Sequence, residues 1–161
     1  MKLKEFLNKF NIKLKLTAPF LEAEIQFCDA DKEAAWEMYI ELLTRCATRM
    51  LSENEGDNRE VLDSLYKLFD ITREILKKYK RNCENFSKIA ICVLNQHIRP
   101  FVSEWHRYDL EGKPDTNGWG NFREELTKLQ LTLKGYTAML ADMAGVEDFS
   151  NINDDINSIY S

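Results

Sequence analysis

The residues best suited to chemistry lie together in one short stretch of the chain, residues 96–108. It contains both histidines of the chain, two arginines, a tryptophan and a tyrosine: His97, His106, Arg99, Arg107, Trp105 and Tyr108. A histidine can give and take protons near neutral pH, and a guanidinium can bind a phosphate through two parallel hydrogen bonds. The chemistry that these residue types favour is therefore reaction at a phosphate group.

Arg99 and His106 are seven residues apart, and this spacing places them on one face if the stretch is helical. Seven residues are almost two helical turns, with a drift of only about 20°. His106 could then move protons to or from the 2′-hydroxyl and the leaving oxygen of RNA. Arg99 could hold the scissile phosphate and stabilise its developing charge. The pair predicts a ribonuclease site.

The same residues resemble the R-x(4–6)-H motif of the HEPN superfamily, here Arg99 to His106, and the extended H-x-Y form fits His106-Arg107-Tyr108. The resemblance implies a compact bundle of four or five helices and a metal-independent ribonuclease that dimerises, so that two motifs face one cleft. It would place catalysis on Arg99 and His106 and give Tyr108 a regulatory or modified role. Pro100 stands where the motif often has a polar residue, and a whole further helix follows the motif.

Three longer stretches resemble small, stand-alone helical bacterial proteins that have no assigned activity. They are Ala34–Arg45 (AAWEMYIELLTR), Ser64–Leu76 (SLYKLFDITREIL) and Leu94–His106 (LNQHIRPFVSEWH). We associate such proteins with mobile or defence gene neighbourhoods. This second resemblance implies an accessory protein of that kind and names no chemistry.

Structural interpretations of the same side chains stay open at the level of sequence. His106 could cap carbonyls at a helix end, where a positive charge is favoured. Arg99 could satisfy a carbonyl freed by Pro100, because proline has no N–H to donate. Recognition of RNA without catalysis is a further alternative.

Other arginines could extend an anion-binding or RNA-binding site around this pair. Arg45 and Arg73 lie in otherwise apolar helical stretches, and Arg107 directly follows His106. The alternative is that these arginines form ion pairs with nearby carboxylates or lay their stems along apolar surface.

Docking of a protein partner would need an exposed apolar patch on the order of several hundred Å². Aromatic residues around the longest loop, 109–120, are candidates for it: Phe101, Trp105, Trp119 and Phe122. A ribonuclease would instead need Arg99 and His106 to converge on an open cleft with electropositive walls. This difference separates the two functions in a structure.

Four helices must position these residues, because apolar side chains recur at helical spacing in four segments after residue 28. The expected helices run from Asp29 or Asp31 to about Leu51, from Asp57 to the basic run at 77–81, from Asn82 or Asn85 to about Trp105, and from Asn121 to Gly145. Pro100 interrupts the third segment, and the apolar spacing beyond it predicts a kink and not an end.

The first 28 residues follow a different pattern. After a short helical stripe from Leu3 to Phe10, apolar residues alternate with charged or polar ones over 12–16 and again over 21–27. This period of two predicts a β-hairpin that turns at residues 17–19. An isolated hairpin is marginal in water, so we expect it to pack on the helical body or to pair with another chain.

The fold prediction is therefore mainly α, with a single domain over 1–161. It consists of an N-terminal helix and hairpin (1–28), an antiparallel four-helix bundle (29–145) and a small C-terminal helix in the tail (146–161), where helical spacing is weak.

Composition excludes several classes of protein. The 161 residues are 44% hydrophobic and 30% charged, which is typical of a globular domain. No apolar run approaches the roughly 20 residues of a membrane span, and the first ten residues contain no signal-peptide core, so we expect a cytoplasmic protein without membrane contact. A net charge of −5 disfavours broad binding to duplex DNA.

The four cysteines, at positions 28, 46, 83 and 92, lack the spacing of zinc ligands, so we expect free thiols, no metal and no cofactor. Two functions follow from the sequence. The first is a cytoplasmic accessory protein of a bacterial defence system that docks a protein partner or self-associates through helix faces. The second is a HEPN-like ribonuclease that uses Arg99 and His106 on RNA.

Overall fold

The computed structural model describes residues 1–45, 58–110, 120–150 and 152. Within these residues every regular element is a helix, and the one β contact is an isolated antiparallel bridge between Lys2 and Glu24. The elements are α1 (Leu3–Lys9), α2 (Ala18–Glu22), α3 (Asp29–Thr44), α4 (Asn58–Tyr79), the 3-10 turn η2 (Lys80–Cys83), α5 (Glu84–Val93), the π turn η3 (Leu94–Ile98), α6 (Arg99–Leu110) and α7 (Phe122–Ala144). The prediction of a mainly α fold is confirmed.

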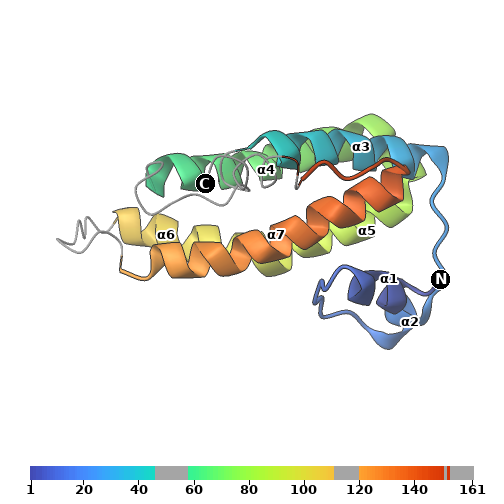
Figure 1. Cartoon of the computed structure of the whole chain (residues 1–161), viewed down its shortest axis with the longest axis horizontal. Helices are drawn as coiled ribbons and strands as arrows, with labels where there is room; N and C mark the ends of the chain where they lie inside the picture. Colours follow the sequence, from blue (N-terminus) through green and yellow to red (C-terminus); the bar gives the residue numbers. More distant parts are fainter. Residues whose placement is uncertain (46–57, 111–119, 151, 153–161) are drawn as a thin grey trace.

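The long helices lie in two layers, with α3 and α4 in one and α5, α6 and α7 in the other (Figure 1). Successive long helices run in opposite directions along the long axis, and α5 and α6 together form one rod. The closest packing between the layers is that of α3 on α7. The chain leaves the helical conformation at Arg45 (ψ 143°), so α3 ends earlier than the expected Leu51, which lies outside the described residues.

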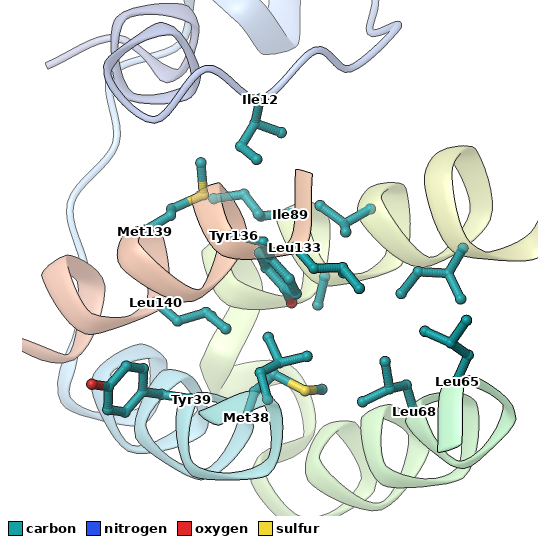
Figure 2. Close-up of a cluster of buried hydrophobic side chains, with 14 of the residues drawn as sticks. Ile12, Met38, Tyr39, Leu65, Leu68, Ile89, Leu133, Tyr136, Met139 and Leu140 are labelled. Carbon is teal, nitrogen blue, oxygen red and sulfur yellow. The ribbon is translucent and has the colours of Figure 1, made fainter. Parts of the chain in front are cut away.

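The core fills the space between the layers and continues to the N-terminal segment (Figure 2). It includes buried side chains from α3, α4, α5, α7 and residue 12: Met38, Tyr39, Leu65, Leu68, Ile89, Leu133, Tyr136, Met139, Leu140 and Ile12. Burial on this scale supplies the main stabilising term of the fold.

The helix continues past Pro100, as the apolar spacing predicts, and the interruption is absorbed by the π turn η3 just before it. The proline ring has no N–H and clashes with the carbonyl four residues earlier. A π turn widens the helix locally and is a known way to accommodate such a break. This turn carries the side chains of Gln96 and His97, which hold the N-terminal segment.

The predicted hairpin is wrong. Residues 12–17 are extended but have no partner strand, and Ala18–Glu22 form α2, with Pro19 in its first turn, where proline is favoured. The alternation reflects which side chains of the segment face the helical body. Ile12 is buried and Leu14 half-buried, while Lys13 is exposed. An extended segment lying on a helical body shows the same period of two as a strand.

Side chains of the π turn form hydrogen bonds with the backbone of residues 13–15. In a hairpin, a second strand would have supplied such bonds. The Lys15 amide donates to Gln96 Oε1 (2.7 Å), and Gln96 Nε2 donates to the Lys15 carbonyl (3.0 Å). His97 Nε2 donates to the Lys13 carbonyl at 2.6 Å. Residues 13–15 are thus fixed to the body without a sheet.

The N-terminal segment packs on the body of its own chain along α5 and α7. The Phe10 carbonyl approaches α7 so closely that a Cβ atom at Gly135 would lie 2.5 Å from it. Asn85 donates to the Gln26 carbonyl at 2.6 Å, and Lys9 pairs with Asp142 at 3.4 Å.

The chain after α7 folds back toward α3. Gly145 ends α7 in the left-handed conformation (φ 73°), and the Phe149 amide donates to Tyr39 Oη at 2.6 Å. Residues 146–150 are not helical, so the predicted tail helix is wrong there. The rest of that prediction, apart from Ile152, lies outside the described residues.

Candidate functional site

Arg99 and His106 lie on the edge of α6 that faces α4. The guanidinium carbon of Arg99 is 4.7 Å from the centre of the Phe69 ring. The His106 ring meets the Tyr66 ring edge to face, with 5.5 Å between their centres. Tyr66 and Phe69 are three residues apart on α4 and therefore neighbours on its surface. The structure thus places the arginine and the histidine along the same helix–helix boundary.

In the described part of the chain, this boundary is an exposed surface. Both side chains are exposed, and Arg99 Nε donates to Asn95 Oδ1 (3.1 Å) on the preceding helical turn. Neither Arg99 nor His106 lines any of the three open cavities of the described chain that are considered below.

Tyr108 lies on a different side of α6 from His106. Its ring packs on Trp105 at 5.2 Å, and the Trp105 indole donates to Glu125 Oε2 (3.0 Å) on α7. The reason is helical geometry, because residues two apart on a helix do not share a face. The three residues of the R-x(6)-H-x-Y pattern therefore do not converge.

The additional arginines are not gathered around Arg99. Arg45 pairs with Glu41 at 2.8 Å, Arg73 pairs with Asp70 at 2.8 Å, and Arg107 is exposed on α6. Both ion pairs join residues three or four positions apart on one helical segment, as expected if these arginines pair with nearby carboxylates. The anion pocket predicted from these arginines together is not formed.

Arg45 instead lines a cavity of about 570 Å³ where α3 ends and α4 begins. Its charged lining is mixed, with three cationic and three anionic side chains: Arg45, Arg59, Lys67, Glu41, Glu60 and Asp63. A balanced set of charges gives this cavity no preference for anions.

The docking patch predicted around the long loop is wrong for three of its four residues. Phe101, Trp105 and Phe122 are at most 7% exposed. Phe122, the first residue of α7, packs on the other two, with its ring 5.3 Å from that of Phe101 and 5.1 Å from that of Trp105. They form an aromatic cluster in the core, while Trp119 lies outside the described residues.

An exposed apolar groove lies instead between α3 and α4, with a volume of about 340 Å³. On α3, Trp36 is 40% exposed and Ile40 is 37% exposed, and they stand one turn apart. On α4, Ile71 and Ile75 complete the apolar lining. In the sequence, Trp36 and Ile40 belong to one apolar helical stripe, which is wider than one buried face requires.

The rim of this groove carries more negative than positive charge. Its lining includes Glu37, Glu41 and Glu74 against Lys78 alone. Glu37 pairs with Lys78, which raises the pKa of the Lys78 ammonium through a hydrogen bond. Within the described residues no cation stands at ion-pair distance from Glu74. We call this feature the α3–α4 groove.

Comparisons with family models, with curated proteins and with solved structures found no match to this chain. In the described part of the chain, no helix has both the length and the apolar composition that membrane crossing requires. The same residues contain no group of three or more His, Cys, Asp or Glu side chains placed to hold a metal ion. Function is therefore inferred from geometry and charge.

Proposed function

We propose that this chain is a helical interaction protein that docks a partner through the α3–α4 groove. The observation that carries the proposal is the exposure of Trp36 and Ile40, one turn apart, above an apolar floor from α4. Large apolar side chains exposed together and rimmed by polar groups are typical of protein interaction sites. Tryptophan is also among the residues that contribute most to binding when an interface covers them.

We further infer an accessory role in a bacterial defence system, in the cytoplasm, from the resemblance of 34–45, 64–76 and 94–106 to small helical proteins of that kind. In this proposal α3, α4, the α5–α6 rod and α7 act as an antiparallel four-helix bundle that holds the groove rigid. A preformed groove reduces the ordering cost of binding.

The occupant that fits the α3–α4 groove is an amphipathic helix of another protein, apolar on one face and basic along its edges. A groove between two helices accepts the apolar anchors of such a helix at intervals of three and four residues. Glu37 and Glu41 are paired with Lys78 and Arg45, so Glu74 is the carboxylate of the lining that favours a cationic flank. A second copy of this chain fits less well, because a symmetric dimer through this groove brings two acidic rims together.

Calorimetry with two synthetic helices tests the proposal. One peptide places leucines on one face and lysines on the other, and the second replaces every lysine with glutamate. We expect the leucine–lysine peptide to bind one site, and Trp36→Ala to weaken it by about 2 kcal/mol, which is about thirtyfold. Leu131→Ala is the matched control, because Leu131 is 61% exposed on α7, away from the groove. Equal weakening by both variants, or equal binding of the two peptides, contradicts the proposal.

Ribonuclease activity is the second candidate function. The observation that favours it is the position of Arg99 and His106 on one edge of α6, against Phe69 and Tyr66. Resemblance to the HEPN superfamily adds a dimer in which two such edges would face one cleft.

Cleavage of RNA in EDTA tests this second function. The wild-type protein should cleave, and His106→Ala and Arg99→Ala should lose the activity while keeping the far-ultraviolet circular dichroism of the wild type. His97→Ala is the matched histidine control, because His97 holds the Lys13 carbonyl and faces the N-terminal segment. Absence of cleavage on single-stranded and structured RNA rejects the ribonuclease proposal.

A further inference from the structure

A second hollow, of about 680 Å³, lies between the N-terminal segment and the body. Its walls come from α1, the extended residues 12–15, α2 and the π turn η3. Small-molecule sites in proteins have volumes of roughly 300–1,000 Å³. Figure 1 shows α1 and α2 beside the layer of α5, α6 and α7, while α3 and α4 form the other layer. The hollow and the α3–α4 groove share no lining residue.

One wall of the hollow is hydrocarbon. It is formed by four aliphatic side chains: Leu7, Ile12, Leu14 and Leu21. Leu7 and Ile12 are 3% exposed and belong to the core, while Leu14 and Leu21 are half-buried. Contact with such a wall favours an apolar ligand body, since each methylene group removed from water contributes about 0.8 kcal/mol.

The lining of the hollow also includes three lysines, Lys4, Lys13 and Lys15. Lys4 is already paired with Glu22 at 2.6 Å, but within the described residues no carboxylate lies at ion-pair distance from Lys13 or Lys15. Alternate residues of an extended chain point to the same side, about 7 Å apart. Lys13 and Lys15 are exposed and both line the hollow, so they bring two uncompensated positive charges to its rim.

The frame that holds these lysines is rigid before any ligand arrives. Gln96 binds both the amide and the carbonyl of Lys15, and His97 binds the Lys13 carbonyl. Next to them, Ile12 is 3% exposed and lies against α7, where a Cβ atom at Gly135 would be 3.2 Å from its Cδ1. A site whose backbone is already fixed loses little conformational entropy on binding.

We propose that this hollow binds an amphipathic carboxylate, with its hydrocarbon body against the leucines and its carboxylate between Lys13 and Lys15. Neither the class of ligand nor the hollow depends on the docking function. A neutral hydrocarbon would form no ion pair with Lys13 or Lys15. A small inorganic anion would leave the aliphatic side chains of the hollow exposed to water.

Calorimetry of the full chain with decanoate, below its micelle concentration, tests this proposal. We expect saturable binding of one decanoate and at least tenfold weaker binding to the double variant Lys13→Gln/Lys15→Gln. Lys77→Gln/Lys128→Gln is the matched control, because it removes the same charge at two exposed lysines that do not line the hollow. This control should bind decanoate like the wild type.

Two further ligands make the outcome decisive. Acetate, which lacks the hydrocarbon body, and decyltrimethylammonium, which has the opposite charge, should both bind at least tenfold more weakly than decanoate. Absence of saturable decanoate binding, equal loss in the two double variants, or equal affinity for decyltrimethylammonium overturns the proposal. Lys13, Lys15, Lys77 and Lys128 are all exposed, so the variants keep the wild-type fold.

Discussion

Asp31 is a buried carboxylate that joins the start of α3 to the start of α5. It is 2% exposed. Its Oδ2 accepts a hydrogen bond from the Cys28 amide at 3.2 Å, and its Oδ1 accepts one from the Phe86 amide at 2.9 Å. One side chain thus caps one helix and satisfies the first turn of another.

We expect Asp31→Ala to lower the free energy of unfolding by about 2–4 kcal/mol, because two amides lose their acceptor and one of them is buried. Urea unfolding followed by circular dichroism measures the change. Asp29→Ala is the matched control, since Asp29 is exposed in the same helical turn. Equal effects of the two substitutions would show that Asp31 acts only as a generic charge near the helix start.

Gly135 is the position at which the N-terminal segment comes closest to α7. An exposed glycine-to-alanine change inside a helix ordinarily stabilises it by about 0.5–1 kcal/mol. Here the added Cβ atom would lie 2.5 Å from the Phe10 carbonyl oxygen, which is backbone and cannot rotate away. We expect Gly135→Ala to destabilise the protein by about 1–3 kcal/mol.

Urea unfolding of Gly135→Ala should therefore give a lower midpoint than the wild type. Ser103→Ala, at an exposed position of α6, provides the baseline for an alanine substitution without a clash. A Gly135→Ala variant that is more stable than the wild type is incompatible with close contact between residue 10 and α7.

At the scale of the element, the π turn acts as a clamp on the extended residues 13–15. Gln96→Ala removes two hydrogen bonds to Lys15. Each is worth about 1 kcal/mol, so the Lys15 amide should exchange with solvent at least about fivefold faster. Hydrogen exchange monitored by NMR measures this rate.

The neighbouring substitution Asn95→Ala is the control for the clamp, because the Asn95 side chain accepts a hydrogen bond from Arg99 in the same rod and makes none to the described N-terminal segment. Exchange at Lys15 should stay at the wild-type rate in Asn95→Ala. An unchanged rate in Gln96→Ala would mean that Lys15 is protected by something other than the π turn.

The junction of α1 and α2 depends on pH through Glu22. Hydrogen bonds from Lys4 and Lys2 lower the pKa of Glu22 from 4.5 to about 2. Because the pKa in the folded state is the lower one, the contribution of Glu22 to stability is complete above about pH 4.5 and is lost as the pH falls toward 2.

An NMR titration of the Glu22 carboxyl carbon checks this expectation. The midpoint should lie well below 4.5, and Glu22→Gln should remove this component of the acid sensitivity. A Glu22 midpoint at 4.5 would show that the carboxylate is not held by the two lysines in solution.

At the same scale, the helices could be predicted from sequence and the N-terminal segment could not. Periodic apolar residues identified all four long helical segments, including the continuation past Pro100. The alternation in residues 12–16 was interpreted as a strand. A period of two shows only that one side of the segment is covered by other atoms, and not that the cover is a second strand. That side is covered by the helical body, through Gln96 and His97, and such a long-range contact leaves no local signal.

At the scale of the whole molecule, the candidate sites could be predicted only in part. The spacing of Arg99 and His106 correctly implied a common edge, since helical geometry fixes it. The exposed patch was assigned to Phe101, Trp105 and Phe122, although α7 buries them. Helical periodicity does not say which part of a wide apolar stripe meets the core. On α3, the structure leaves Trp36 and Ile40 of that stripe on the surface.

The whole molecule therefore presents its acidic, apolar groove between α3 and α4 and its cationic hollow between the N-terminal segment and the body. Added salt should distinguish the charged contacts at these two sites from the apolar ones. Screening weakens contacts between exposed charges, whereas burial of Trp36 by a partner helix is retained.

A chemical-shift map of the full chain with the leucine–lysine helix tests the central claim most directly. The account predicts that the amides of Trp36, Ile40 and Ile71 shift on titration and saturate together. In Trp36→Ala the titration midpoint should move to about thirtyfold higher peptide concentration. Shifts centred instead on Arg99 and His106, or spread evenly over the acidic surface, would contradict docking in the α3–α4 groove.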